Sequence, residues 1–219
     1  MKPCPGGARR PFRRAAEFDA LGTFKDYMKN PSGLRRRFAM HSYEEVETAL
    51  GKFRLACGPK GVTMVHPADT APAEFESAYE RRMGVKPERG KIPESYVRAL
   101  RDAAAGRPFE AVPIDLGRLS RFQRKVLSAL RDVPRGEVRT YGWLARRAGH
   151  PGAARAAGGA LARNPVPILI PCHRAVPASG GIGNFGLGVA MKRALLRSEG
   201  LPVEAPCCRP ERGRTRKMS

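Results

Sequence analysis

The sequence has no long apolar run and few acidic residues. No stretch approaches the roughly 18 apolar residues that span a bilayer, so no membrane-spanning segment is expected. Aspartate and glutamate number 20 against 41 lysines and arginines, which gives a formal net charge of +21. Each basic side chain that meets a phosphate releases a condensed counterion. The imbalance therefore favours nucleic acid as a partner, with a solvated basic surface as the alternative.

Cysteine pairs with regular spacing are also missing. The count is odd, the spacing is irregular and there is no CxxC motif, so neither a disulfide framework nor a thiolate zinc site is expected. The basic start lacks the apolar run of a secretory signal. We therefore expect an intracellular, reducing compartment in which free thiols persist. The cysteines are Cys4, Cys57, Cys172, Cys207 and Cys208.

Composition divides the chain into four parts. Residues 1–47 are a basic, weakly ordered arm, in which 43–50 is compatible with a short helix, and 202–219 form a similar tail. Either end can bind DNA non-specifically, serve as a nuclear address or have no role. Between them we expect domains at 48–117 and 118–201.

The first of these domains is predicted to be a small α/β unit. A β-hairpin is expected from 53–57 and 62–66, which flank a Gly-Pro-Lys-Gly turn. Helices are expected over 72–83 and 93–105, and alternating apolar residues at 109–116 favour a third strand. No catalytic constellation stands out in this domain.

The second domain is predicted to be mostly helical. Apolar residues repeat at helical spacing from Phe122 to Val133. Thr140 is placed to cap a helix over 141–148, and Pro151 to open another that runs to Leu161. Two helices joined by a short glycine-containing turn are typical of a DNA-binding helix-turn-helix, although an ordinary helical hairpin gives the same pattern.

The second helix of this pair carries an unusual surface. Alanine and glycine dominate it, and Arg155 is its one long side chain before Leu161. A bare helix lets its backbone approach another surface closely. A lone arginine on it suits insertion into a duplex better than broad reading of bases.

A stiff apolar segment leads to Cys172 and His173. Three prolines interrupt the run over 164–171, and each removes a backbone donor. Thiolates are nucleophiles, whereas a free cysteine with a pKa of about 8.5 is largely a thiol near neutral pH. A neighbouring imidazole can take the proton. A buried, inert cysteine beside a surface histidine is the alternative.

Glu199 is the candidate third group of this site. It follows Leu195 and Leu196 at helical spacing, so it shares their apolar face near the end of a helix over 188–199. A carboxylate there is disfavoured by burial and by the helix dipole and needs a partner, which His173 would provide. A frayed last turn with the carboxylate in solvent is the alternative.

The segment 139–200 closely resembles the O6-alkylguanine-DNA alkyltransferases. The resemblance covers about 50–200, more weakly before 118, and several motifs occur in the same order. They are Pro171-Cys172-His173-Arg174, Gly136-Glu137-Val138-Arg139-Thr140-Tyr141, Ala153-Ala154-Arg155-Ala156, Asn164-Pro165, Gly183-Asn184-Phe185 and 192–199.

The resemblance implies a direct repair reaction. Cys172 would accept an alkyl group, chiefly methyl, from O6-alkylguanine and also from O4-alkylthymine in DNA. Transfer would be stoichiometric and irreversible, because water does not readily cleave the thioether. His173 and Glu199 would activate the thiol through a bound water, Asn164 would brace the backbone, and Tyr141 would donate to N3 of the flipped guanine.

The same resemblance implies binding through the minor groove. Arg155 would fill the gap that the flipped base leaves, and flipping itself costs a few kcal/mol. The implied DNA-binding residues are Tyr141, Gly142, His150, Arg155 and Gly158.

The implied substrate pocket departs from the family pattern. Ala175 stands where valine is usual, Phe185 where tyrosine is common, and Gly186-Leu187 where some relatives have Ser-Gly. If Leu187 overhangs the pocket, benzyl is disfavoured relative to methyl. The implied pocket residues are Pro167, Ala175, Phe185, Gly186 and Leu187.

The implied fold is an amino-terminal ribonuclease-H-like α/β domain followed by a helical domain with a helix-turn-helix. Cys57 and His66 do not reproduce the zinc ligands of some relatives, so we expect no metal and no cofactor. The expected partner is double-stranded DNA with an alkylated guanine. We expect the protein to be a monomer and to act in the cytoplasm, nucleoid or nucleus.

Three other functions share parts of this pattern. A non-catalytic protein that binds and signals alkylated DNA is one, but relatives of that kind lack the cysteine at 172. A Cys-His-Glu hydrolase would need an oxyanion hole and would turn over. A DNA-binding regulator would use the helix pair alone.

Overall fold

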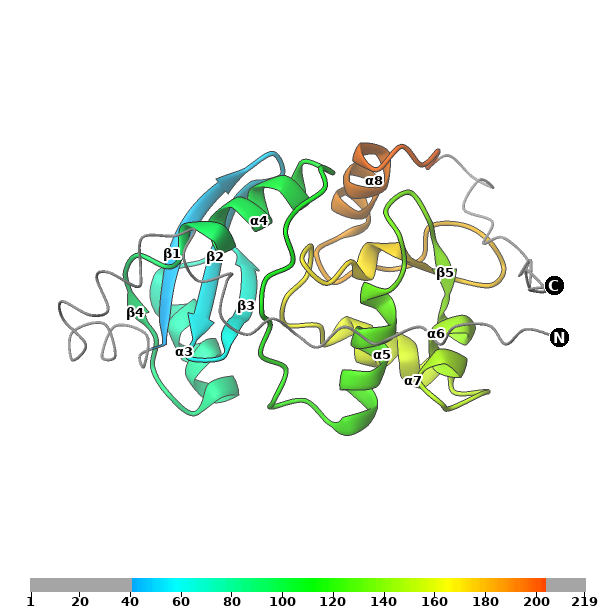
Figure 1. The fold of residues 1–219 in the computed structure, drawn as a ribbon, viewed down its shortest axis with the longest axis horizontal. Helices are drawn as coiled ribbons and strands as arrows, with labels where there is room; N and C mark the ends of the chain where they lie inside the picture. The colour runs from blue at the N-terminus through cyan, green and yellow to red at the C-terminus, as the bar shows by residue number, and fades with distance from the viewer. Residues whose placement is uncertain (1–40, 204–219) are drawn as a thin grey trace, which may run out of the picture. The chain divides into compact units, whose positions relative to one another are not determined.

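The computed structural model describes residues 41–203, which contain a mixed α/β arrangement of a sheet and helices. A four-stranded sheet has the order β3-β2-β1-β4 (Figure 1). Strands β1, β2 and β3 are antiparallel neighbours, and the short β4 runs parallel to β1. The strands are β1 (Ser42–Thr48), β2 (Gly51–Gly58), β3 (Gly61–Pro67) and β4 (Glu88–Arg89).

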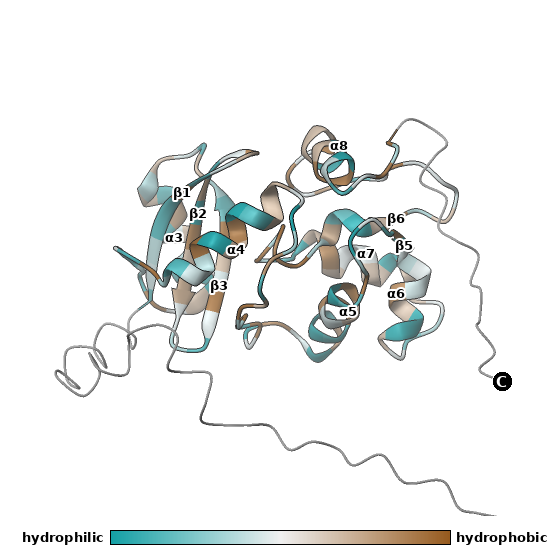
Figure 2. Cartoon of the chain, turned by 45° about the horizontal axis from the view of Figure 1, so that its top comes forward, coloured by the Kyte–Doolittle hydropathy of each residue, from teal (hydrophilic) through white to brown (hydrophobic). Residues whose placement is uncertain are grey.

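Each face of the sheet packs against a helix. Alternation along β2 sends Phe53 and Leu55 to one face and Arg54 to the other. Helix α3 (Pro72–Met83) closes the second face with Phe75, and α4 (Glu94–Ala104) joins the first in the main core. Figure 2 shows the hydrophilic and hydrophobic sides of α4. The predicted hairpin and both predicted helices are thus confirmed.

The helix considered for 43–50 is wrong, because this segment forms β1 and its turn. Val46 pairs with Phe53 in the register of β1 and β2. The glutamates of this segment obscure the alternation of apolar and polar residues that would indicate a strand. One of them, Glu45, lies on the α3 side of the sheet and pairs with Arg54, which is only 2% exposed. The ordered sheet therefore begins at Ser42, inside the segment expected to be an arm, while 1–40 and 204–219 lie outside the described residues.

The third strand predicted over 109–116 is also wrong. Only an isolated bridge between Ile114 and Val62 forms. Pro108 and Pro113 interrupt the segment, and a proline cannot donate to a ladder. The carbonyl of Pro113 still accepts from Val62 at 2.9 Å, so the segment lies along the edge of β3.

Helices dominate the remainder of the described chain. The parallel pair β5 and β6 is its small sheet. Helices α6 and α7 pack together, and both pack on α5 (Figure 1). The elements are α5 (Arg121–Arg131), β5 (Arg139–Thr140), α6 (Tyr141–Arg147), α7 (Ala154–Ala162), η2 (Cys172–Arg174), β6 (Ala175–Val176) and α8 (Val189–Ser198).

Local residue choices explain where these helices begin. Thr140 caps α6 as predicted, because its hydroxyl accepts from the backbone N–H of Trp143 at 3.1 Å. Pro151 does not open α7, which starts three residues later. Gly152 adopts φ +86°, outside the helical region, so Pro151 and Gly152 form a turn instead.

No helix within the described range 41–203 is long and apolar enough to cross a membrane.

The cap of α6 yields a stability prediction. Replacing Thr140 by alanine leaves a helix N–H without its partner, so Thr140→Ala should lower the free energy of unfolding by about 0.5–2 kcal/mol. Thr140→Ser keeps the oxygen and is the matched control, expected to lose much less. Urea denaturation of the three proteins measures the difference, and equal losses in both variants would show that the methyl group matters and the cap does not.

Candidate active site

The segment before Cys172 is a buried, tightly turned loop. All residues from 166 to 170 are buried, as predicted. Ile168 has φ +73°, a conformation that is uncommon for a bulky β-branched residue. The turn closes with a hydrogen bond from the N–H of Ile170 to the carbonyl of Val166 at 2.9 Å. This loop delivers Cys172 into η2 as a free thiol that is 8% exposed.

Asn164 contacts both the sulfur and the loop. Its Nδ2 lies 3.2 Å from the Sγ of Cys172 and donates to the carbonyl of Ile170 at 3.1 Å. Its Oδ1 accepts from the N–H of Val166 at 3.1 Å. One amide therefore bridges the two ends of the loop and orients the sulfur.

His173 and Glu199 form a buried pair. The Nε2 of His173 lies 2.8 Å from the Oε1 of Glu199, and their side chains are 2% and 3% exposed. The solvent-exposed alternative for Glu199 is therefore wrong. The Nδ1 of His173 is buried and has no hydrogen-bond partner among residues 41–203. If Nε2 carries the proton that Glu199 accepts, Nδ1 remains a proton acceptor.

Arg174 binds the same carboxylate. Its Nε donates to the Oε2 of Glu199 at 3.0 Å, and its Nη2 donates to Oε1 at 2.8 Å. Its Nη1 donates to the carbonyl of Val133 at 2.6 Å. The guanidinium thus joins the end of α8 to the chain just after α5.

These contacts set the protonation states. Burial raises the pKa of Cys172 to about 11, and Asn164 only partly opposes it. Burial also lowers the pKa of His173, although Glu199 favours the charged imidazole. Burial alone would raise the pKa of Glu199, but hydrogen bonds from His173 and Arg174 outweigh it and lower the pKa to about 2. The site therefore combines a thiol, a neutral imidazole and a carboxylate.

Lys192 adds a buried cation beside this group. It is fully buried on α8, and its Nζ donates to the carbonyl of Ala175 at 2.7 Å. Its charge favours the ionised form of Cys172 and disfavours the protonated form of His173. A positive charge is thus held near the sulfur.

Tyr141 is half-buried at the start of α6, near Cys172. Burial and the nearby Cys172 both raise the pKa of its phenol, so Tyr141 remains a hydrogen-bond donor at neutral pH. Gly183 lies directly under the hydroxyl, because a Cβ built there would come within 3.3 Å of it. Gly158 of α7 lies against the ring in the same way, at 4.0 Å.

The predicted pocket residues differ in their exposure. Pro167 and Ala175 are buried. Phe185 is half-buried and meets the ring of His173 edge to face, with centroids 6.5 Å apart. Leu187 is also half-buried and packs against the main core, while Gly186 is exposed.

The predicted DNA-binding residues lie on or near α6 and α7. Arg155 is exposed in the first turn of α7, and Gly142 is half-buried in α6. His150 is exposed in the turn between these helices, where its ring meets Phe122 edge to face at 5.0 Å.

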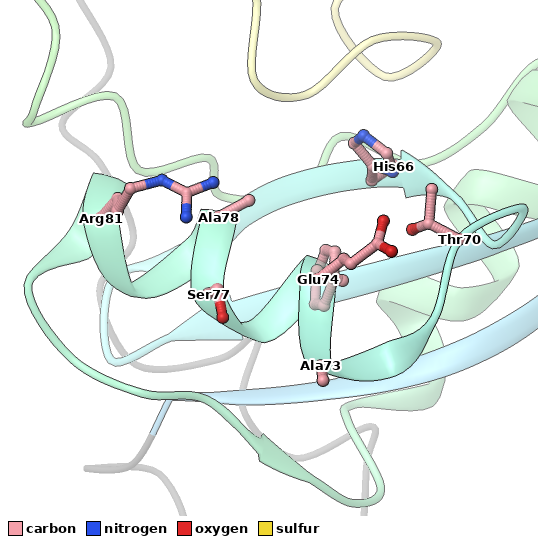
Figure 3. Close-up of a pocket in the computed structure, with 8 residues that line it drawn as sticks. His66, Thr70, Ala73, Glu74, Ser77, Ala78 and Arg81 are labelled. Atoms are coloured by element: carbon pink, nitrogen blue, oxygen red, sulfur yellow. The ribbon is translucent and has the colours of Figure 1, made fainter.

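A pocket of about 490 Å³ lies elsewhere, between the end of β3 and α3. Figure 3 shows Arg81 at one end and His66, Thr70 and Glu74 at the other. None of the predicted site residues lines it. The arrangement around Cys172 is therefore separate from this pocket. Among residues 41–203, no group of three or more His, Cys, Asp or Glu side chains is placed to hold a metal ion.

Comparison with known proteins places this arrangement in a family. Residues 121–201 match the family described as 6-O-methylguanine DNA methyltransferase, DNA binding domain. The methylated-DNA–protein-cysteine methyltransferase of Mus musculus is 38% identical over 180 residues, covering 75% of this chain and 83% of the relative. The chain belongs to the O6-methylguanine-DNA methyltransferase family.

Other relatives and solved structures agree with this assignment. The methylated-DNA–protein-cysteine methyltransferase of Cricetulus griseus is 47% identical over 109 residues, 49% of this chain. The chain spans about half the length of that relative, 52%. A crystal structure of Mycobacterium tuberculosis OGT in complex with DNA superposes with a TM-score of 0.60 at 35% identity, covering 72% of this chain and 92% of that one. The Pyrococcus kodakaraensis O6-methylguanine-DNA methyltransferase gives 0.56 at 26% identity, covering 74% and 100%.

Two residues of this site had no role predicted from the sequence. Lys192 lies three residues before Leu195 on the same helix face, a spacing that indicates burial. Arg174 follows His173 directly, and a buried carboxylate that contacts only a neutral histidine lacks a counter-charge. The spacing of Lys192 is a signal in the sequence, whereas the contact of Arg174 with Glu199 depends on the turn of η2.

The Glu199 pKa yields a prediction for stability against pH. Its folded pKa of about 2 lies below the ordinary 4.5, so its contribution is complete above about pH 4.5 and is lost as the pH falls towards 2. The loss should be on the order of 3 kcal/mol. Urea denaturation between neutral and acid pH should therefore show a shallower pH dependence for Glu199→Gln than for the parent. The exposed Glu110→Gln is the control, and a slope in Glu199→Gln equal to the parent's would contradict the prediction.

Proposed function

We propose that this protein repairs alkylated DNA by moving the alkyl group of O6-alkylguanine, chiefly methyl, onto Cys172. The observation that carries the proposal is the buried arrangement of Cys172, Asn164, His173 and Glu199 in a chain of this family. O4-alkylthymine is a second substrate under the same proposal.

The chemistry requires a proton acceptor because the thiol is poorly ionised. Its pKa of about 11 leaves little thiolate at neutral pH. Neutral His173 takes the proton through Nδ1, directly or through one water, and Glu199 stabilises the resulting imidazolium. The sulfur then forms a bond to the alkyl carbon as the bond from that carbon to O6 breaks, and guanine keeps the electron pair.

Tyr141 assists the departure of guanine. Its raised pKa keeps the phenol protonated, so it can donate to N3 of the base on which negative charge develops. The product at Cys172 is a thioether. One protein molecule therefore repairs one lesion.

The DNA surface of the proposal is the pair α6 and α7, read as a helix-turn-helix. Its glycines allow close approach to the minor groove, and exposed Arg155 replaces the flipped base in the stack. Gly142, His150 and Gly158 contact the duplex. The preceding sheet domain is the ribonuclease-H-like part, with domains at 48–117 and 118–201.

Substrate range is set at the lip of the pocket. Leu187 biases the site towards methyl over benzyl if its side chain projects over the pocket, where Phe185 lacks a hydroxyl, while Pro167, Ala175 and Gly186 complete the lining. The protein acts as a monomer, without cofactor, wherever the cell keeps its DNA. A damage-signalling protein without transfer is the second candidate, favoured by the basic charge alone.

The central prediction is single-turnover transfer to Cys172. After incubation with excess O6-methylguanine duplex, mass spectrometry should find one methyl group on the peptide that holds Cys172. Cys172→Ser should still bind the duplex and accept nothing, because a serine hydroxyl is a far weaker nucleophile. Cys57→Ser removes the other buried thiol of the described chain and should behave like the parent. Repeated turnover, or label at Cys57, would refute the proposal.

Arg155 should matter only when a base must be flipped. Arg155→Ala should slow repair of duplex DNA by about tenfold to a hundredfold, since flipping costs a few kcal/mol. Reaction with free O6-methylguanine should change little. Rapid-quench kinetics on both substrates measure the two effects, with Arg98→Ala, an exposed arginine on α4, as the control. Equal losses on both substrates would assign Arg155 to the chemistry or to stability.

A further inference from the structure

We propose that Arg174 is a positioning residue, which fixes the Glu199 carboxylate and keeps His173 neutral so that His173 can take the proton of Cys172. The inference deepens the proposed function and rests on it for the role of Cys172. It assigns a task to the arginine that follows the reactive Cys-His pair.

The geometry holds Arg174 from two sides. One edge of the guanidinium donates three hydrogen bonds to Glu199, at 2.8, 3.0 and 3.2 Å. Its Nη1 donates to the carbonyl of Val133 at 2.6 Å. The Arg174 side chain is only 12% exposed. Such a two-sided arrangement restricts the guanidinium, and with it the carboxylate that faces His173.

Burial is the main reason why a proton is disfavoured on His173, and the positive charges around the imidazole add to it. The negative charge of Glu199 is already matched by Arg174, and Lys192 adds a second positive charge nearby. Protonation of His173 would place a third positive charge in a buried site. Without Arg174, an unmatched carboxylate would face His173 and favour its protonated form.

The charges that act on His173 come from two segments. The end of α8 brings Glu199 and Lys192, and Arg174 follows His173 directly in η2. The two titratable groups beside them are Cys172, which precedes His173, and Tyr141 of α6, which lies near that thiol.

A second contact fixes the backbone of Glu199 without touching its charge. The Nη2 of Arg135 donates to the carbonyl of Ser198 at 2.8 Å. Gly106 packs on the same carbonyl, where a Cβ would come within 2.4 Å. Arg135→Ala is therefore a matched variant that alters the position of the helix end and leaves the Arg174 charge in place.

The test measures the rate of Cys172 methylation by O6-methylguanine duplex against pH. For Arg174→Gln the acid limb of the profile should move to higher pH by about one unit or more. The rate should therefore fall relative to the parent at acid pH and recover most of the parent value as the pH rises. Arg174→Lys keeps a cation, so its limb should stay near that of the parent. Arg135→Ala should lower the rate by the same factor at every pH.

A second readout does not depend on methyl transfer. The chain has four histidines, so the imidazole resonances of labelled protein can be assigned with His173→Gln. In Arg174→Gln the His173 resonance should titrate at higher pH than in the parent, whereas the exposed Arg131→Met control should match the parent. An unmoved His173 titration, or a rate loss that is equal at every pH, would overturn the proposal. If the parent methylates no thiol, the proposed function fails, and the titration still decides the role of Arg174.

Discussion

The buried carboxylate of Glu199 is the group around which the site is organised. Removing an ionised carboxylate from water costs several kcal/mol unless strong partners surround it. His173 and Arg174 provide those partners, and each lies one or two residues after the sulfur. Because the carboxylate ends α8, satisfying it also docks that helix against η2. The position of Cys172 therefore depends on a charge at the carboxyl end of α8.

Much of the helical part could be predicted from local signals, and the strands less well. Apolar residues at helical spacing and the Thr140 cap are properties of a few neighbouring residues, and they predicted α5 and α6. Strand β1 was missed because its glutamates are satisfied by distant residues such as Arg54. The start of α7 was misplaced because the φ of Gly152 decided against Pro151. Tertiary partners and backbone conformation were the missing information.

The candidate site shows the same division. Burial of Glu199 and its pairing with His173 followed from helix periodicity and the cost of an isolated charge. The hydrogen bonds from Arg174 to Glu199 could not be predicted in this way. They form because the three-residue turn of η2 lets the adjacent side chains of His173 and Arg174 reach the same carboxylate. The positive φ of Ile168 could not be predicted from the sequence either, because Val166 to Ile170 is simply an apolar run there.

The burial of the thiol fits the proposed transfer, in which the nucleophile reacts only once. A thiolate exposed to solvent would react with many electrophiles and oxidants, and each such event would remove a molecule from the proposed repair. Burial raises the pKa of Cys172 to about 11 and so suppresses that reactivity. Under the proposed function, activation must then come from within the site, where neutral His173 would accept the proton and Lys192 favours the thiolate. Under the proposal for Arg174, this arginine matters most at the acid end of the pH range. There a histidine with a bare carboxylate neighbour would already carry the proton that it has to accept.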